Sequence, residues 1–181
     1  MADAPPSALS TVELSNTTFV FYVNADGYIG YLKGPADSAN TKQTTVYSEP
    51  QLVKVGSEKV QVFEGFEHLG AIAYNEKQMR VYYVAKNPDN KKQPILKEIW
   101  SDDVGTTWKY GALGDDMKYS VMQGSGINAV VLPGTNELRV YFTSDTNRSL
   151  AVAWMPAIGD LHAGDWNLAA KLRSVKDSWN V

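Results

Sequence analysis

The hydrophobic positions of this chain fall in short runs of β-branched and aromatic residues, with polar turns between them and almost no 3.6-residue period. The runs Phe19–Val23 and Tyr28–Leu32 flank the turn Asn24–Gly27, where a glycine supplies the positive φ that a tight hairpin needs. Many short runs of this kind, each bounded by turn residues, are typical of an all-β fold. The pattern therefore predicts strands throughout.

Two of these runs begin around an arginine and repeat one order of landmarks. They are Met79–Val84 and Leu138–Thr143, and each follows a small-apolar run. In both copies a strand ending in tryptophan comes next, and a second tryptophan follows; these are Trp100 with Trp108, and Trp154 with Trp166. Landmarks that recur in one order indicate an internal repeat.

The spacing extends the repeat to a third, earlier copy. Arg80 and Arg139 lie 59 residues apart, and a step of 61 residues back from Arg80 reaches Phe19. The same step back from Trp108 reaches Tyr47. Three copies of about 55 to 60 residues, each with four strands, predict the blades of a β-propeller.

We expect a tail over residues 1–8, because Pro5 and Pro6 cannot join a sheet interior. A single domain then covers residues 9–181, with blades at about 9–65, 66–122 and 123–175.

Three blades cannot close a ring, because known propellers use about four to eight. The open edges would expose unpaired backbone groups, which favours aggregation. We therefore expect a homodimer in which two chains complete one six-bladed ring with two-fold symmetry. A monomeric ring with a degenerate fourth blade is the alternative, although Leu172–Val175 resembles one strand and not a blade.

Composition and charge narrow the function classes. The 181 residues are 44% hydrophobic with a net charge of −3, and no basic cluster exceeds Lys91-Lys92. That balance argues against nucleic acid or an anionic membrane as a partner. No apolar run is long enough to cross a bilayer. The first residues lack the features of a secretory signal, so we expect a cytoplasmic location.

Few residues offer conventional catalytic or metal chemistry. Cysteine is absent, and the two histidines, His68 and His162, lie 94 residues apart. We therefore expect no metal and no cofactor. The acidic pairs Asp102-Asp103 and Asp115-Asp116 lack the calcium-loop pattern and are interpreted as solvated turns.

The order of landmarks in the repeat resembles the fungal fucose-specific lectins of the Aleuria type. In that family each sugar lies between neighbouring blades. An arginine of the second strand and a glutamate of the third strand hold its hydroxyls, and aromatic rings cover its apolar side. The resemblance implies that Arg80 and Glu98 are the polar pair in the second blade of this chain.

The resemblance also implies a set of neighbouring ligand contacts. Tyr82 and Trp100 accompany the pair in the second blade, and Tyr141 or Trp154 of the next blade would supply an aromatic wall. Two alternatives stay open. Arg80 and Glu98 could form only a structural ion pair, and the tryptophans could serve packing between blades.

The other two blades depart from the family pattern. In the third blade Arg139 is kept, but the glutamate position falls on Val152. In the first blade the pair becomes Phe19 and Tyr31. At most one site of three keeps both polar members, and the altered sites suit an apolar ligand better than a sugar.

Two functions follow from these observations. The first is a lectin-like propeller that binds a fucose-type sugar. The alternative is a fungal secondary-metabolite enzyme on the same scaffold, a cofactor-free lyase or cyclase. It would catalyse dehydration, cyclisation or a (hetero-)Diels–Alder-type step in an aromatic-lined apolar pocket. Its candidate catalytic residues are Arg80, Glu98 and His68.

Overall fold

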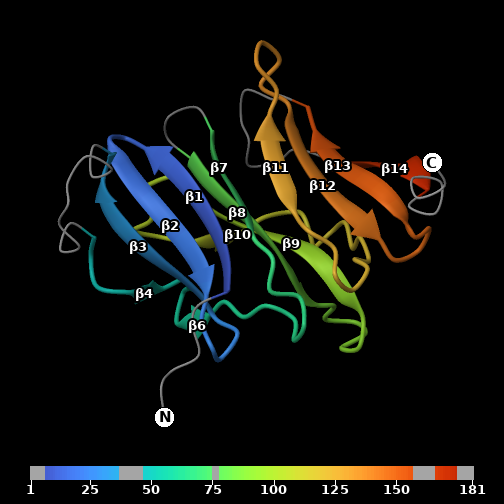
Figure 1. Cartoon of the computed structure of the whole chain (residues 1–181), viewed down its shortest axis with the longest axis horizontal. Helices are drawn as coiled ribbons and strands as arrows, with labels where there is room; N and C mark the ends of the chain where they lie inside the picture. The colour runs from blue at the N-terminus through green and yellow to red at the C-terminus, as the bar shows by residue number, and fades with distance from the viewer. Residues whose placement is uncertain (1–6, 37–46, 75–77, 157–165, 175–181) are drawn as a thin grey trace.

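The computed structural model describes residues 7–36, 47–74, 78–156 and 166–174, and these residues form strands, turns and loops without a helix. Three four-stranded antiparallel sheets stand side by side like the blades of a fan (Figure 1). Within the described part of the chain there is accordingly no helix long and apolar enough to cross a membrane. The all-β prediction is confirmed.

Each sheet takes its four strands in chain order. The first blade consists of β1 (Ser7–Leu14), β2 (Thr17–Val23), β3 (Ile29–Pro35) and β4 (Gln51–Leu52). The second consists of β7 (Gly70–Tyr74), β8 (Gln78–Lys86), β9 (Pro94–Ser101) and β10 (Lys109–Tyr110). The third consists of β11 (Asn128–Val131), β12 (Leu138–Ser144), β13 (Ser149–Met155) and β14 (Asn167–Ser174). A small hairpin, β5 (Lys54–Val55) with β6 (Glu58–Lys59), links the first two blades.

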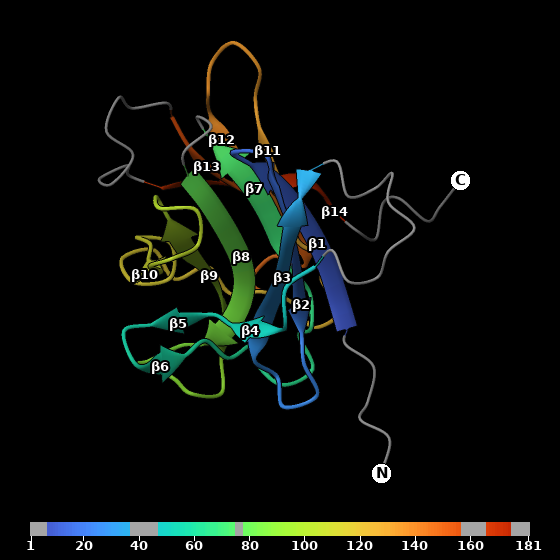
Figure 2. The ribbon, with the colours of Figure 1, turned by 90° about the vertical axis from the view of Figure 1, so that its left-hand side faces the viewer.

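The first strands of the three blades are neighbours. β7 lies between β1 and β11, and the later strands of each blade extend away from them (Figures 1 and 2). This is the arrangement of inner strands in a β-propeller. The described blades form an arc, so completion of a six-bladed ring by a second copy stays a prediction.

One boundary prediction needs correction. β1 begins at Ser7, inside the segment that we expected to be a tail, because residues from Ser7 onward pair with β2. At the other end, Leu172 belongs to β14, the fourth strand of the third blade, which agrees with the expectation of a single strand there. The described residues therefore offer no separate strand for a degenerate fourth blade. Residues 1–6 and Val175 lie outside the described residues.

Alternation along β8 explains how the blades pack. Met79, Val81 and Tyr83 point into a hydrophobic core shared with the first blade, whereas Tyr82 and Val84 point into a second core shared with the third blade. Successive side chains of a strand point to opposite faces. A middle blade therefore buries both faces, and its second strand is buried continuously from Gln78 to Ala85.

The turn between β9 and β10 is tied together by Asp103. Its Oδ1 atom accepts hydrogen bonds from Ser101 Oγ at 2.7 Å and from the Thr107 backbone N–H at 2.8 Å. Burial opposes ionisation of the carboxyl, but hydrogen bonds from Thr107, Ser101 and Thr106 outweigh it and lower the pKa to about 2. Asp103 thus organises a turn that we had interpreted as merely solvated.

Candidate functional site

Each blade turns one side of its sheet towards the next blade along the chain, and we call this side its forward face. The opposite side is its rear face. Cross-strand pairing places Phe21 opposite Tyr31, Tyr82 opposite Glu98, and Tyr141 opposite Val152. The three forward faces can therefore be compared position by position.

The forward face of the first blade is closed by aromatic rings. Phe19 stacks on Phe21 with 6.2 Å between ring centroids, and Tyr31 lies 5.9 Å from each of them. Trp108 of the second blade meets Phe21 edge-on at 5.7 Å. These rings are buried against one another, so this face is packed core between the first two blades.

The forward face of the second blade holds the predicted polar pair. Arg80 Nη1 donates to Glu98 Oε1, and Arg80 Nη2 donates to Gln78 Oε1 at 3.2 Å. The Arg80 and Glu98 side chains are only 3% and 1% exposed. A Cβ on Gly111 would stand 2.1 Å from Glu98 Oε2, so the carboxylate lies directly against the backbone of the residue that follows β10. Arg80 and Glu98 thus lie in contact, as the sequence indicated, but both side chains are buried.

Tyr82 and Trp100 are also buried. The Tyr82 hydroxyl is fully buried and has no hydrogen-bond partner in the described part of the chain. Burial, with the Glu98 carboxylate as a smaller contributor, raises the pKa of Tyr82 well above its usual value. Trp100 Nε1 donates to the Tyr110 carbonyl at 3.3 Å, and Lys109 Nζ lies 4.5 Å from the indole centroid.

Tyr141 and Trp154 do not provide the expected wall for the second-blade pair. They lie on the forward face of the third blade, whereas Val140, Phe142 and Ala153 face the second blade. The prediction was wrong because the side chains of β12 and β13 alternate, and the two aromatic positions fall on the far side. Trp166 takes their place and meets Tyr82 edge-on at 5.9 Å.

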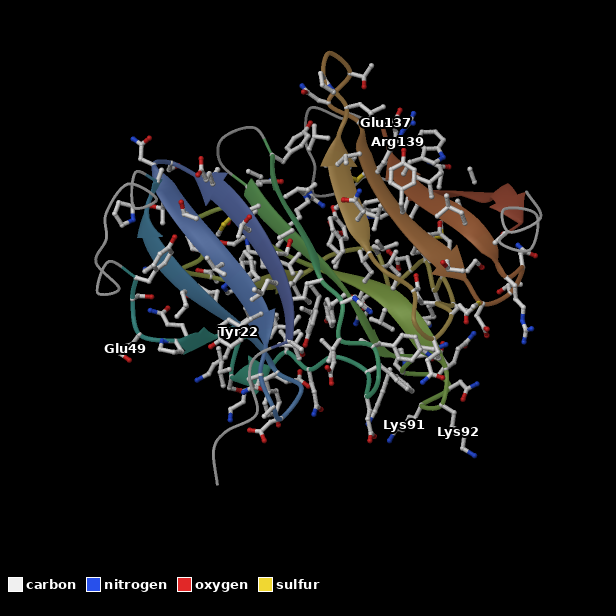
Figure 3. All side chains as sticks on the ribbon, in the orientation of Figure 1. Tyr22, Glu49, Lys91, Lys92, Glu137 and Arg139 are labelled. Carbon is white, nitrogen blue, oxygen red and sulfur yellow. The ribbon has the colours of Figure 1, made fainter. Side chains whose placement is uncertain are left out.

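The forward face of the third blade carries an open ion pair instead. Arg139 Nε donates to Glu137 Oε1, and the two side chains are 37% and 20% exposed (Figure 3). The carboxylate of Glu137, followed by the phenol of Tyr141, raises the pKa of Arg139 above its ordinary value. The partner missing at Val152 is therefore supplied from the arginine's own segment.

Glu137 was not predicted, although the sequence contains a signal for it. Residues two apart on a strand point to the same face, so an acid two positions before the arginine can reach it. The same position of the second blade holds Gln78, which also binds its arginine. The family pattern places the acid on the third strand, whereas Glu137 directly precedes the second strand of its blade.

Aromatic and apolar groups surround the open pair. Trp154 is the cross-strand neighbour of Arg139, and Tyr141 lies two residues along the same strand. Both rings are half-buried, and Leu150 on the same face is 40% exposed. Arg139, Tyr141 and Trp154 thus form one group of predicted residues, separate from the buried group around Arg80.

The structure does not bring His68 to Arg80 and Glu98. His68 is exposed and lines a shallow surface pocket with Ser7, Ala8, Gly65 and Glu67. His162 lies outside the described residues. The predicted catalytic set is therefore not assembled as a cluster.

A larger groove lies near one end of the inner strands, and its described lining carries no aromatic ring. The lining residues are Glu13, Leu14, Ser15, Asn16, Ala36, Ala73 and Asn136. This groove does not match the aromatic-lined chamber expected for an enzyme. Among the described residues there is also no group of three acidic or histidine side chains placed to hold a metal ion.

No protein-family model matches the sequence, and no curated protein matches it significantly. Solved structures do match. A fucose-specific lectin from Aleuria aurantia superposes with a TM-score of 0.55 at 17% identity, over 90% of this chain and 47% of the lectin. AofleA from Arthrobotrys oligospora superposes with a TM-score of 0.57 at 19% identity, over 90% of this chain and 42% of AofleA.

The protein therefore has the β-propeller fold of these lectin structures, and the predicted resemblance is confirmed at the level of the fold. The chain spans slightly less than half the length of either protein.

Proposed function

We propose that this protein is a lectin-like propeller that binds a sugar on the forward face of its third blade. The observation that carries the proposal is the half-buried, solvent-accessible Arg139–Glu137 pair, bordered by Tyr141 and Trp154. The pair occupies the repeat position that holds Arg80 in the second blade. The fold shared with two lectin structures supports the assignment without fixing the ligand.

The chemistry of this face suits a ligand with hydroxyl groups on one side and C–H groups on the other. The Arg139 guanidinium offers N–H donors, and the Glu137 carboxylate offers acceptors, so both can form charge-assisted hydrogen bonds to hydroxyls. The rings of Tyr141 and Trp154 provide amphipathic surface for the C–H side. Because the ion pair holds Arg139 in place, less side-chain freedom is lost when a sugar binds.

The buried pair of the second blade is less suited to binding. A sugar could reach Arg80 and Glu98 only if the second and third blades separated, which would expose the core that contains Tyr82 and Trp166. The structural interpretation of this pair, which the sequence left open, is therefore favoured. We assign Arg80 and Glu98 to blade packing.

A 6-deoxy sugar of the L-fucose type is the ligand class that we propose for the third blade. Such a sugar carries a methyl group in place of a hydroxymethyl group. Leu150, on the same face as Arg139 and 40% exposed, offers apolar surface to that methyl group. One of the structural neighbours is itself described as fucose-specific.

Calorimetric titration with L-fucose, with L-galactose as the 6-hydroxylated counterpart, tests the proposal. Wild-type protein should bind L-fucose more tightly than L-galactose, and Arg139→Ala should lose binding while keeping its unfolding midpoint. Arg148→Asn is the matched control, because Arg148 is an exposed arginine of the same blade with a positive φ that asparagine tolerates. Unchanged binding in Arg139→Ala contradicts the assignment.

A further inference from the structure

The two arginine-led strands meet their acids through different atoms. Arg80 of the second blade donates through Nη1 to Glu98 of the neighbouring strand, and through Nη2 to Gln78 at 3.2 Å. Arg139 of the third blade donates through Nε to Glu137 at 2.5 Å. A guanidinium carries five N–H donors, so a carboxylate oxygen at Nε leaves donors of Arg139 for a ligand.

The position two residues before the arginine differs in charge between the two blades. It holds neutral Gln78 where the third strand carries Glu98, and charged Glu137 where the third strand carries Val152. Gln78 shows that an amide at this position already binds the arginine. Arg139 also reaches solvent, so its charge does not need a carboxylate in order to be tolerated. The negative charge of Glu137 therefore exceeds what positioning of Arg139 requires.

The turn before β12 fixes the place of Glu137. Leu132 donates its backbone N–H to the Glu137 carbonyl at 2.9 Å, and the Glu137 N–H donates to Thr135 Oγ1 at 3.4 Å. Glu137 and Arg139 lie side by side at the beginning of β12 (Figure 3). The carboxylate is thus held at the edge of the forward face before a ligand arrives.

The surroundings of the pair are uncharged. On the strands of this forward face, the described side chains other than Arg139 are neutral, among them Val130, Tyr141 and Trp154. An incoming anion is consequently attracted by Arg139 and repelled by the neighbouring Glu137.

We propose that Glu137 restricts the third-blade site to uncharged sugars and excludes sugars that carry a sulfate or a carboxylate. The inference rests on the proposed function, because it names the class of sugar that the same site takes. Arg139 alone would bind an oxyanion, since a guanidinium matches the oxygens of such groups. Glu137 occupies one of its donors first and places a like charge beside any competing oxyanion, and repulsive elements of this kind give binding sites their specificity.

The proposed orientation of the sugar determines which probes are informative. With the methyl group of L-fucose on Leu150, the ring hydroxyls face the ion pair. A sulfate on one of these hydroxyls brings its negative charge close to Glu137 and leaves the contact of the methyl group unchanged. Fucosides that are sulfated at a single ring oxygen therefore test the charge of the site.

Calorimetric titration with three methyl L-fucosides, sulfated at O2, O3 or O4, measures the exclusion. The fucosides methylated at the same oxygens are the neutral counterparts. Wild-type protein should bind at least one sulfated fucoside roughly tenfold more weakly than its counterpart, because like charges are brought together. Glu137→Gln should remove or reverse that difference, since Arg139 then pairs with the sulfate.

Asp145→Asn is the matched control for this titration. It removes one negative charge from an exposed turn of the same blade and should keep the wild-type preference. Equal binding of sulfated and neutral fucosides by wild-type protein overturns the exclusion and leaves the proposed function intact. A preference that persists unchanged in Glu137→Gln also overturns it, because the cause is then steric.

Inorganic sulfate tests Glu137 without a sugar. The chain has four arginines, so the Nε–H resonance of Arg139 can be identified by its loss in Arg139→Ala and followed during titration with sodium sulfate. Sodium chloride at equal ionic strength is the reference. The resonance should shift saturably in Glu137→Gln and stay in place in wild-type protein. Saturable binding in wild-type protein, or none in Glu137→Gln, overturns the role of Glu137 whether or not the protein binds fucose.

Discussion

The second and third blades carry the same arginine-led strand with opposite surroundings. Arg80 is paired with Glu98 on the neighbouring strand, and the pair is buried beneath the next blade. Arg139 is paired with Glu137 on its own segment, and the pair is half-buried and reaches solvent. The two arginines occupy the same position of the repeat. Whether that position is buried depends on whether a following blade covers it, and the acid that pairs with the arginine comes from a different segment in each blade. The same repeat position is therefore buried in one blade and reaches solvent in another.

The largest expected effect is on the buried pair. Glu98→Ala leaves the Arg80 charge uncompensated in the core and should lower the free energy of unfolding by about 3–5 kcal/mol. Chemical denaturation monitored by tryptophan fluorescence measures this. Glu137→Ala in the third blade is the matched control and should cost less than about 1 kcal/mol, because ion pairs that reach solvent contribute little. Equal losses of unfolding free energy in the two variants would contradict the claim that only the Arg80–Glu98 pair depends on burial.

A second expected effect concerns Gly111, against which the Glu98 carboxylate lies. A Cβ at this position would overlap Glu98 Oε2, so Gly111→Ala should destabilise the fold by about 1–3 kcal/mol. Gly126→Ala provides the control, since a Cβ there meets nothing within 4 Å. Thermal unfolding of both variants measures the difference. A wild-type midpoint in Gly111→Ala would show that the carboxylate moves aside easily.

The turn at Asp103 gives a smaller effect that depends on pH. Its pKa is about 2 in the folded chain against an ordinary value of 3.8, so the folded state favours the ionised carboxylate. The stabilisation is present above about pH 4 and is lost as the pH falls towards 2. Asp103→Asn should therefore flatten the dependence of unfolding free energy on pH in this window. A pH dependence identical to that of wild-type protein would contradict the role of the carboxylate.

The smallest effect on stability is expected at the open pair, where the change should appear in binding. Glu137→Gln keeps the shape of the side chain but removes its charge, so Arg139 loses a charge-assisted partner. We expect a weaker affinity for L-fucose with an unfolding midpoint close to wild type. Calorimetry and thermal unfolding on the same sample separate the two. A destabilised fold with unchanged affinity would assign Glu137 to structure instead.

Much of the fold could be predicted because it depends on local pattern. The alternating runs and the spacing of Arg80, Arg139 and the tryptophans indicated four-stranded repeats, and the three sheets follow that division. The beginning of β1 was missed, because Pro5-Pro6 suggested a longer tail and nothing local showed that Ser7 pairs with Val23.

The site was harder to predict, because it depends on which blade covers which face. The sequence identified Arg80 with Glu98 but could not show that Trp166 and the third blade bury them. The sequence indicated Arg139 but not Glu137, because the family pattern places the acid on the third strand and Glu137 precedes the second. Burial is a property of neighbouring sheets, and spacing within one strand does not reveal it.

Crystallographic soaking with a selenium-labelled methyl L-fucoside tests the central claim most directly. The anomalous signal of selenium locates the sugar without prior choice of a site. The account predicts a peak on the forward face of the third blade, within contact distance of Arg139 and Trp154, and none between the second and third blades. A peak beside Arg80 and Glu98, with the blades parted around it, would contradict the assignment of the buried pair to packing.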